Sequence, residues 1–222
     1  MENKIIYCFW FGDNMSPARE ECFQSIKNNS GVNVELITEQ NLKDYLVTPL
    51  HKGFDYLSST HKSDYLRSYF MYHYGGGYSD IKKCHYDWNK YFDMLSSSDK
   101  EFIGSRERAK KHIANFEVAR EYQNLVTVIN FIFKPKTKIA KIWYEKTQKL
   151  MDDKFDQLVQ NPGNYHPRAI AGGVHMEPEL FKESKYPFEW NELLGRIFHK
   201  LQWENYGSYL LDMPFPDQKG YR

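Results

Sequence analysis

The stretch Ile5-Ile6-Tyr7-Cys8-Phe9-Trp10-Phe11 decides the fold class, because it begins a strand-helix-strand pattern near the start of the chain. We interpret it as a buried strand, since it is too short for a membrane span or for a signal peptide with its cleavage site. Ser16 is expected to cap a helix from Pro17 to Lys27, and a second strand follows from Val32 to Ile37. A crossover of this length places two parallel strands side by side with the helix on one face. The sequence therefore predicts an α/β fold.

The remaining segments extend this pattern without a repeat or a linker. A helix is expected from Lys62 to Tyr74, because aromatic and apolar side chains recur there at helical spacing and Gly75 allows a left-handed stop. Other expected elements are short helices at Glu39 to Tyr45 and Gly53 to Ser58, strands at Gly77 to Ile81, Glu101 to Gly104 and Leu125 to Phe133, a helix at Lys138 to Asp152 and a loop at Gln160 to Pro167. We therefore treat residues 1–222 as a single domain, which is either a whole protein or one module of a longer polypeptide.

The balance of charge favours a small-molecule partner over nucleic acid. The chain holds 30 Lys and Arg residues against 29 Asp and Glu residues, so it lacks the basic surplus that is typical of nucleic-acid binding. Aromatic residues make up 17% of the chain and can supply stacking surfaces for bases or sugars.

The cysteines favour a reducing compartment. Cys8, Cys22 and Cys84 show neither the spacing of a zinc site nor the even count of a disulfide framework. Since no signal peptide and no integral membrane segment is visible, we expect a cytoplasmic protein of a bacterial cell or of a virus-infected host cell.

Two adjacent blocks indicate the chemistry: His61-Lys62-Ser63-Asp64-Tyr65-Leu66-Arg67 and Tyr74-Gly75-Gly76-Gly77-Tyr78-Ser79-Asp80-Ile81-Lys82. Asp64 and Arg67 share a helix face, and the planar guanidinium of Arg67 can bind phosphate through two hydrogen bonds. Asp80 follows glycines at the tip of a strand, where carboxylate oxygens suit hard cations such as Mg²⁺ or Mn²⁺. The two blocks therefore indicate a site for a metal-bound diphosphate.

Lys82 stands where a second carboxylate would be expected, and three interpretations are open. Lys82 can itself supply the positive charge that neutralises a departing phosphate. Alternatively, Asp80 and Lys82 simply pair with each other, because side chains two residues apart on a strand share a face. In the third interpretation, Asp80 still holds the ion with help from elsewhere in the chain.

The blocks Lys4 to Gly12, Ser63 to Arg67 and Tyr74 to Asp80 together resemble the DxD-containing sugar transferases of the Och1 and capsular-polysaccharide type, and more distantly the glucosylating clostridial toxins. The resemblance implies a GT-A (Rossmann-like) domain whose central sheet is mixed, mostly parallel and flanked by helices. It also implies a hexosyltransferase-type enzyme that uses Mn²⁺ or Mg²⁺ and retains the configuration at the anomeric carbon. The implied donor is a nucleoside-diphosphate sugar, with a UDP-sugar favoured, and the implied acceptor is a hydroxyl of a glycan or glycoprotein.

The resemblance also implies roles for individual residues. Asp64 and Asp80 match catalytic positions, and the donor-binding positions are Phe9, Trp10, Asp64, Arg67, Asp80, Lys82 and Asn130. Trp10 would flank the donor base, while Asn130 interrupts an apolar strand in which a buried amide needs partners. Asp80 and His199 are the expected metal ligands, since a neutral imidazole can bind Mn²⁺. His199 belongs to a late block with Trp203 and with the run Tyr206-Gly207-Ser208-Tyr209, and this block would close over the diphosphate.

Two further observations leave alternatives open. The run Ala171-Gly172-Gly173-Val174-His175 resembles a small-residue turn near the acceptor, but a plain turn explains its glycines equally well. No residue stands out as a catalytic base. An inverting enzyme needs a carboxylate placed to deprotonate the acceptor hydroxyl, whereas in retaining transfer the departing phosphate can take that proton. The sequence leaves both open, and retention is favoured by the resemblance alone.

Other functions are weighed against sugar transfer. The first is a catalytically inactive module that binds nucleotide sugars or carbohydrates, produced by loss of the second Asp. The second is a nucleotidyltransferase, which would need more carboxylates at the metal than we can assign.

Overall fold

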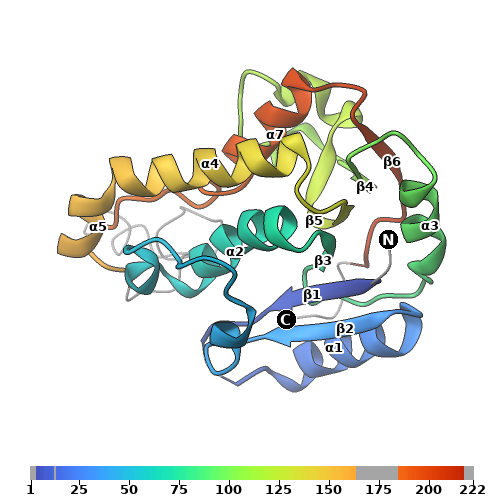
Figure 1. Cartoon of the computed structure of the whole chain (residues 1–222), viewed down its shortest axis with the longest axis horizontal. Helices are drawn as coiled ribbons and strands as arrows, with labels where there is room; N and C mark the ends of the chain where they lie inside the picture. Colours follow the sequence, from blue (N-terminus) through green and yellow to red (C-terminus); the bar gives the residue numbers. More distant parts are fainter. Residues whose placement is uncertain (1–3, 13, 164–184, 218–222) are drawn as a thin grey trace.

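The computed structural model describes residues 4–12, 14–163 and 185–217 (Figure 1). Their strands form one six-stranded sheet with the order β2-β1-β3-β5-β4-β6. The strands are β1 (Ile5–Phe9), β2 (Asn33–Ile37), β3 (Gly76–Ser79), β4 (Phe102–Arg106), β5 (Val126–Phe133) and β6 (Tyr209–Met213). β1 runs parallel to β2 and β3, and β4 runs parallel to β6, whereas β5 is antiparallel to both of its neighbours. The mixed, mostly parallel sheet is therefore confirmed.

Helices lie on both faces of this sheet (Figure 1). They are α1 (Pro17–Asn29), α2 (Ser59–His73), α3 (Asn89–Ser96), α4 (Lys138–Asp153), α5 (Phe155–Gln160) and α7 (Gly195–Glu204). Alternation along β1 separates the two cores: Ile6 and Cys8 pack with α1 and α3, while Tyr7 and Phe9 pack with α2, α4 and α7. The α/β class is thus confirmed, and the arrangement is consistent with the expected GT-A (Rossmann-like) fold.

Local signals in the sequence set the ends of two helices. Ser16 caps α1, accepting a hydrogen bond from the backbone N–H of Arg19 at 3.3 Å, and Pro17 occupies the first helical turn. After α2, Gly75 adopts a φ of 65° and its N–H donates to the carbonyl of Phe70 at 3.1 Å. An added Cβ at Gly75 would lie 2.5 Å from a neighbouring backbone nitrogen, so only glycine fits this turn.

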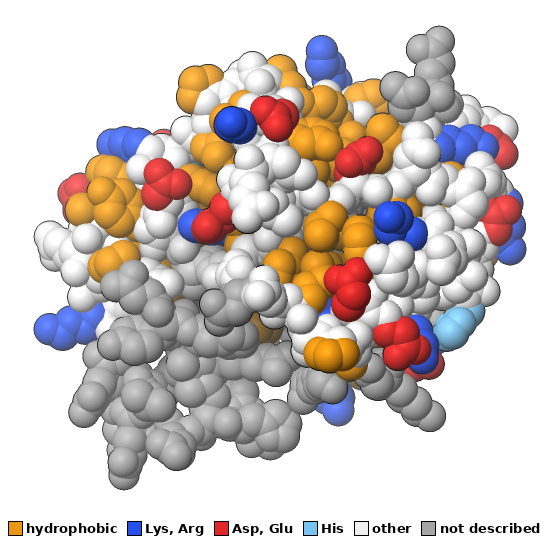
Figure 2. Space-filling view, turned by 90° about the horizontal axis from the view of Figure 1, so that it is seen from below, with side chains coloured by type: hydrophobic (Ala, Val, Ile, Leu, Met, Phe, Trp, Pro, Cys, Tyr) orange, Lys and Arg blue, Asp and Glu red, His pale blue; other side chains and the backbone are white. Residues whose placement is uncertain are grey.

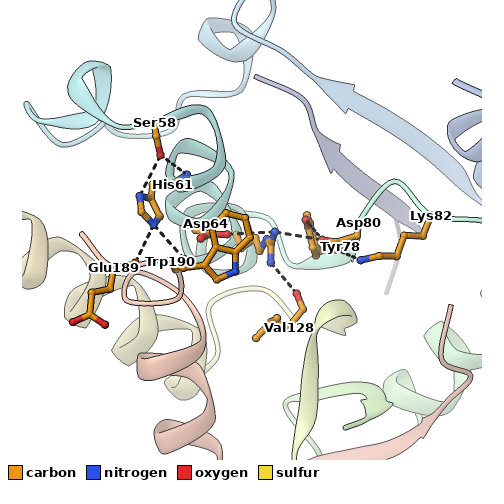
Figure 3. Close-up of polar contacts among 10 residues, drawn as sticks. Ser58, His61, Asp64, Tyr78, Asp80, Lys82, Val128, Glu189 and Trp190 are labelled. Atoms are coloured by element: carbon orange, nitrogen blue, oxygen red, sulfur yellow. Dashed lines mark hydrogen bonds and ion pairs between the residues drawn. The ribbon is translucent and has the colours of Figure 1, made fainter. Parts of the chain in front are cut away.

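The start of α2 is held by a buried histidine. His61 Nδ1 lies 2.8 Å from the hydroxyl of Tyr186. Its Nε2 lies 3.1 Å from the carbonyl of Glu189 and 3.2 Å from that of Trp190 (Figure 3). Because carbonyls only accept, the proton lies on Nε2 and Tyr186 donates to Nδ1. Burial lowers the pKa of His61 to about 4, so the ring is neutral at physiological pH. His61 therefore ties α2 to the segment before α7.

Several sequence predictions needed revision. The expected short helices are single turns of 3-10 helix, at Leu42–Tyr45 and Phe54–Tyr56. Strand β3 ends at Ser79, two residues earlier than predicted, so Asp80 and Lys82 lie beyond it. The helices α3, α5 and α7 and the edge strand β6 were not predicted. Of the loop expected at 160–167, Gln160 is instead the last residue of α5, residues 161–163 are irregular as predicted, and residues 164–167 lie outside the described ranges.

The surface matches the near-neutral composition. On the face in Figure 2, acidic and basic side chains are interspersed rather than gathered by sign. Within the residues that the structure describes, no helix has the length and apolar character needed to cross a membrane.

Candidate functional site

The topology brings the ends of three strands to one edge of the sheet. Since β1, β2 and β3 are parallel, their carboxyl ends meet there, and Trp10 and Asp80 directly follow two of them. Ligands of open α/β sheets bind outside such carboxyl ends. β5 is antiparallel and begins near the same edge, so that the carbonyl of Ile129 accepts a hydrogen bond from the N–H of Asp80 at 2.8 Å.

Asp64, Arg67 and Asp80 form one ionic cluster at this edge. The Nη2 atom of Arg67 lies 3.3 Å from Asp64 Oδ1 and 3.3 Å from Asp80 Oδ1 (Figure 3). Asp64 and Arg67 are 2% and 7% exposed, which makes α2 the buried wall of the cluster. The three residues that the sequence singled out are therefore in contact.

Arg67 is further positioned by two groups. Its Nη1 donates to the carbonyl of Val128 at 3.0 Å, and its guanidinium carbon lies 4.3 Å from the centre of the Tyr78 ring. Its buried Nε has no hydrogen-bond partner among the described residues. The side chain is thus held rigidly by the cluster, by the sheet and by an aromatic face.

Tyr78 connects the cluster to the hydrophobic core. Its hydroxyl donates to Asp80 Oδ1 at 2.6 Å, and its ring stacks on Phe9 at 5.4 Å between centroids. Phe9 also packs edge to face on Phe70 and is buried. Phe9 therefore packs behind Tyr78 on the core side of the cluster, and its direct contact with a donor stays a prediction.

Lys82 closes the cluster on the other side of Asp80. Its Nζ forms an ion pair with Asp80 Oδ2, and its side chain is 8% exposed. Its backbone N–H donates to the carbonyl of Asp80 at 2.8 Å, which identifies a tight turn rather than a strand. The pairing of Asp80 with Lys82, one of the three interpretations left open by the sequence, is present, but the turn after β3 produces it rather than a shared strand face.

The two acids of the cluster differ in their protonation. Burial raises the pKa of Asp64 to about 7, although the neighbouring Arg67 opposes the shift. Burial acts in the same direction on Asp80, but Lys82 and Arg67 outweigh it and hold the pKa of Asp80 below its ordinary value. Asp80 is therefore the permanent negative charge of the site at neutral pH, and Asp64 is only partly ionised.

Trp10 lies at the same edge, next to an arginine that the sequence reasoning missed. The guanidinium carbon of Arg19 lies 5.8 Å from the Trp10 ring centroid, and its Nη1 donates to the carbonyl of Ile81 at 2.7 Å. Arg19 thereby links the first turn of α1 to the turn that carries Lys82. Only its place just after a helix cap beside the first strand could have drawn attention to it.

Asn130 lies on β5, opposite Ser79 in the antiparallel register, and is completely buried. Its Nδ2 donates to Ser105 Oγ at 2.7 Å, to the hydroxyl of Tyr86 at 3.0 Å and to the carbonyl of Pro214 at 3.1 Å. The nitrogen of the amide thus has internal partners, whereas the buried Oδ1 has no hydrogen-bond partner among the described residues. Contact of Asn130 with a donor stays a prediction.

His199 is completely buried on α7, and neither ring nitrogen has a hydrogen-bond partner among the described residues. Burial lowers its pKa to about 3, so the ring is neutral. The acid that it approaches is Glu107, at 3.9 Å between Nε2 and Oε1, which follows β4 at the same sheet edge. Of the late block, Trp203 and Tyr206 are 42% and 65% exposed.

The residues available for a metal are few. Within the described ranges, no group of three or more His, Cys, Asp or Glu side chains is arranged to hold an ion. Joint metal binding by Asp80 and His199 therefore stays a prediction. The predicted acceptor-side turn at Ala171 to His175 lies outside the described residues.

Comparison with known proteins adds two findings. The family model described as "Capsular polysaccharide synthesis protein" matches residues 1–97, less than half of the chain but a span that holds the whole cluster from Trp10 to Lys82. Among solved structures, the chain is similar to the "PaToxG Glycosyltransferase", with 14% identity, a TM-score of 0.48, and coverage of 91% of this chain and 69% of that chain. No curated protein matches the chain.

Proposed function

We propose that this protein is a glycosyltransferase of hexosyltransferase type that moves a sugar from a nucleoside-diphosphate sugar, favouring UDP, to a hydroxyl of a glycan or glycoprotein. The observation that carries the proposal is the buried cluster of Asp64, Arg67 and Asp80, closed by Lys82, at the carboxyl edge of the sheet. Two fixed cations beside a permanent carboxylate suit a ligand that is part phosphate and part sugar.

The chemistry of sugar transfer explains why such a cluster is useful. When the bond between the anomeric carbon and the diphosphate oxygen breaks, negative charge grows on the leaving group. Arg67 and Lys82, both at most 8% exposed on their side chains, are held in place by the cluster and so are preorganised to neutralise that charge. Asp80 can then accept hydrogen bonds from sugar hydroxyls, and Asp64 keeps Arg67 in place.

Two further features support the proposal. Trp10 is half-buried at the edge that Asp80 shares, where its ring can flank a nucleotide base. The match of residues 1–97 to a capsular polysaccharide synthesis family supports a role in polysaccharide biosynthesis, with a growing glycan as acceptor. Retention of configuration is proposed because a departing phosphate can take the acceptor proton, so that no protein base is required.

The cysteines support a reducing location such as the cytoplasm of a bacterial cell or of an infected host cell. All three, Cys8, Cys22 and Cys84, are buried free thiols.

A panel of UDP- and GDP-sugars tests the function. Each donor is incubated with the protein and a mixture of glycan acceptors, with and without Mn²⁺, and released nucleoside diphosphate is measured. The proposal expects one nucleotide series to be turned over, and NMR of the product to show the anomeric configuration of the donor. Inversion would overturn the proposed stereochemistry but not the transferase.

The alternative is a module that binds nucleotide sugars without turnover. It is favoured by one observation: Lys82, Arg67 and Tyr78 already engage both oxygens of Asp80. In that case a donor would raise the melting temperature and change tryptophan fluorescence, while no nucleoside diphosphate would be released.

A further inference from the structure

The carboxylate of Asp80 is surrounded by cations and hydrogen-bond donors rather than by further acids. Lys82 contacts Oδ2, and Oδ1 receives the Tyr78 hydroxyl at 2.6 Å and Arg67 at 3.3 Å. Mg²⁺ at a phosphate site is held through one or two protein carboxylates together with waters and substrate phosphates, so the protein must at least offer a carboxylate oxygen that is free to bind it. A cation at Asp80 would have to displace Lys82 and would stand near the positive charge of Arg67. The described residues therefore do not fit a divalent metal at this position.

The charge of the cluster points the same way. Lys82 places a cationic group where the resembled family has a second aspartate, beside the guanidinium of Arg67. Aspartate in place of Lys82 would remove one positive charge and add one negative charge, so that a divalent ion would then be needed to restore the balance. The chain already supplies the positive charge that a metal would bring.

The backbone fixes Lys82 in this position. Its N–H donates to the carbonyl of Asp80 at 2.8 Å, and the carbonyl of Ile81 accepts from Arg19 at 2.7 Å. The turn is thus held from both sides, and the Lys82 side chain is 8% exposed. A largely buried cation that is already oriented costs little reorganisation when charge develops nearby.

We propose that Lys82, together with Arg67, takes the place of a divalent cation, so that this site binds and cleaves its donor without metal. The inference rests on the proposed sugar transfer. The bond between the anomeric carbon and the diphosphate oxygen breaks, and its electron pair stays on that oxygen. The acceptor oxygen forms the new bond to the anomeric carbon, and its proton passes to the departing phosphate. Lys82 and Arg67 stabilise the diphosphate and are not consumed.

The first test measures binding and turnover after the protein has been treated with EDTA and dialysed. Calorimetric titration with UDP and with GDP, and release of nucleoside diphosphate from the active donor, are compared with EDTA present and with Mn²⁺ added. The proposal expects dissociation constants and rates within about twofold of each other. A dissociation constant about tenfold or more lower, or a rate about tenfold or more higher, on adding Mn²⁺ would overturn it.

The second test changes Lys82 and a neighbour that serves as control. Lys82→Met is expected to weaken nucleoside diphosphate binding about tenfold and turnover about 100-fold. Lys83→Met should leave both unchanged, because Lys83 is 38% exposed and pairs with Glu21 at the surface. Lys82→Arg restores a cation and should recover part of the loss. Circular dichroism of each variant separates loss of charge from loss of fold.

The third test makes the site depend on metal. Lys82→Asp should be inactive in EDTA and should gain about tenfold or more in turnover on adding Mn²⁺. Direct titration of Mn²⁺ should show binding to Lys82→Asp and none to the wild type. Mn²⁺ binding by the wild type that is lost in Asp80→Asn would overturn the inference.

The outcomes separate this inference from the proposed function. If the wild type turns over a donor only with Mn²⁺, the transferase stands and metal-free catalysis is wrong. If UDP or GDP binds equally well in EDTA and Mn²⁺ but no donor is turned over, the transferase and metal-free cleavage are wrong, and metal-free binding of the nucleotide stands. If neither nucleotide binds under any condition, both are wrong.

Discussion

Arg67 joins helix α2 to the end of strand β3, because its Nη2 lies 3.3 Å from Asp80 Oδ1. The same nitrogen lies 3.3 Å from Asp64 Oδ1 on its own helix. One guanidinium therefore holds two carboxylates that come from different elements. Loss of this guanidinium would release both carboxylates at once.

Arg67→Lys keeps the positive charge but cannot contact both acids and the carbonyl of Val128 at once. We expect donor turnover to fall by about 100-fold or more, in line with the loss of one preorganised donor. The free energy of unfolding should fall by about 1–3 kcal/mol, since buried charge-assisted hydrogen bonds are lost. Urea unfolding and nucleoside diphosphate release measure the two effects. Wild-type turnover in Arg67→Lys would contradict the role of Arg67.

Tyr78→Phe removes the hydroxyl that donates to Asp80 and leaves the ring on Phe9 and Arg67 in place. We expect a loss of about 1–2 kcal/mol in unfolding free energy, because Asp80 loses one buried hydrogen bond. Turnover should fall about tenfold, because Asp80 is less firmly oriented. Tyr72→Phe, on the outer side of the same core, is a suitable control. Equal effects of the two substitutions would show that the Tyr78 hydroxyl has no special role.

Buried His61 predicts a dependence of stability on pH. Its pKa is lowered from the ordinary value of 6.5 to about 4, so the unfolded chain binds more protons than the folded chain between these values. Neutral His61 therefore contributes on the order of 3 kcal/mol to the free energy of unfolding. This contribution is fully present above pH 6.5 and is lost as the pH falls to about 4. Asp64 acts in the opposite direction, because its pKa is raised to about 7 and ionisation on raising the pH costs stability.

The comparison that isolates His61 is between the wild type and His61→Gln, which keeps polar contacts but does not titrate. Asp64 and His199 contribute equally to both proteins, so they cancel in the difference. Denaturant unfolding is measured at pH 7 and at pH 4.5. The free energy of unfolding should fall more between these pH values in the wild type than in His61→Gln. Identical pH slopes would mean that His61 is not held neutral.

Arg19 makes two separable contacts, with the carbonyl of Ile81 and with the ring of Trp10. Arg19→Ala should lower kcat about tenfold, because the turn that carries Lys82 loses its support. It should also raise the KM for the donor a few-fold if Trp10 flanks the base, since the ring loses its cation neighbour. Arg19→Lys should recover kcat more than KM, because an ammonium can reach a carbonyl but stacks poorly on a ring. If Arg19→Ala and Arg19→Lys both change kcat and KM by the same factor, the role of Arg19 is purely structural.

His199→Leu replaces an unpartnered buried imidazole by an apolar side chain of similar size. We expect the free energy of unfolding to stay the same or to rise by about 1 kcal/mol, because an unsatisfied polar group is removed. The response of donor binding to Mn²⁺ should not change. A Mn²⁺ response that is present in the wild type and absent in His199→Leu would instead support His199 as a metal ligand.

The parts of the fold that the sequence predicted are those with local signals. The helix α1 has Ser16 and Pro17 at its start, and α2 has Gly75 at its end. The helix α3 was missed because its cap residue, Trp88, makes no side-chain capping bond. Strand β6 was missed because it forms by pairing Tyr209 with the distant Phe102 of β4. The short run Tyr-Leu-Leu-Asp-Met does not by itself predict a strand.

The candidate site shows the same division. Asp64 and Arg67 were predictable as a pair because three residues on a helix bring side chains together. The contact of Arg67 with Asp80 depends on the packing of α2 beside β3. It was still predictable, because the two sequence blocks that carry these residues are adjacent. The approach of His199 to Glu107 joins α7 to the end of β4, and nothing in the sequence indicated it.

The central claim is that Asp80 and its cluster serve to turn over a nucleoside-diphosphate sugar. The most direct test is kcat/KM for release of nucleoside diphosphate by the wild type, by Asp80→Asn and by Asp99→Asn, whose side chain is 84% exposed. We predict that Asp80→Asn lowers kcat/KM about 100-fold or more, while Asp99→Asn matches the wild type. Two results would contradict the account. One is release of nucleoside diphosphate by Asp80→Asn at the wild-type rate, and the other is that the wild type releases none from any UDP- or GDP-sugar.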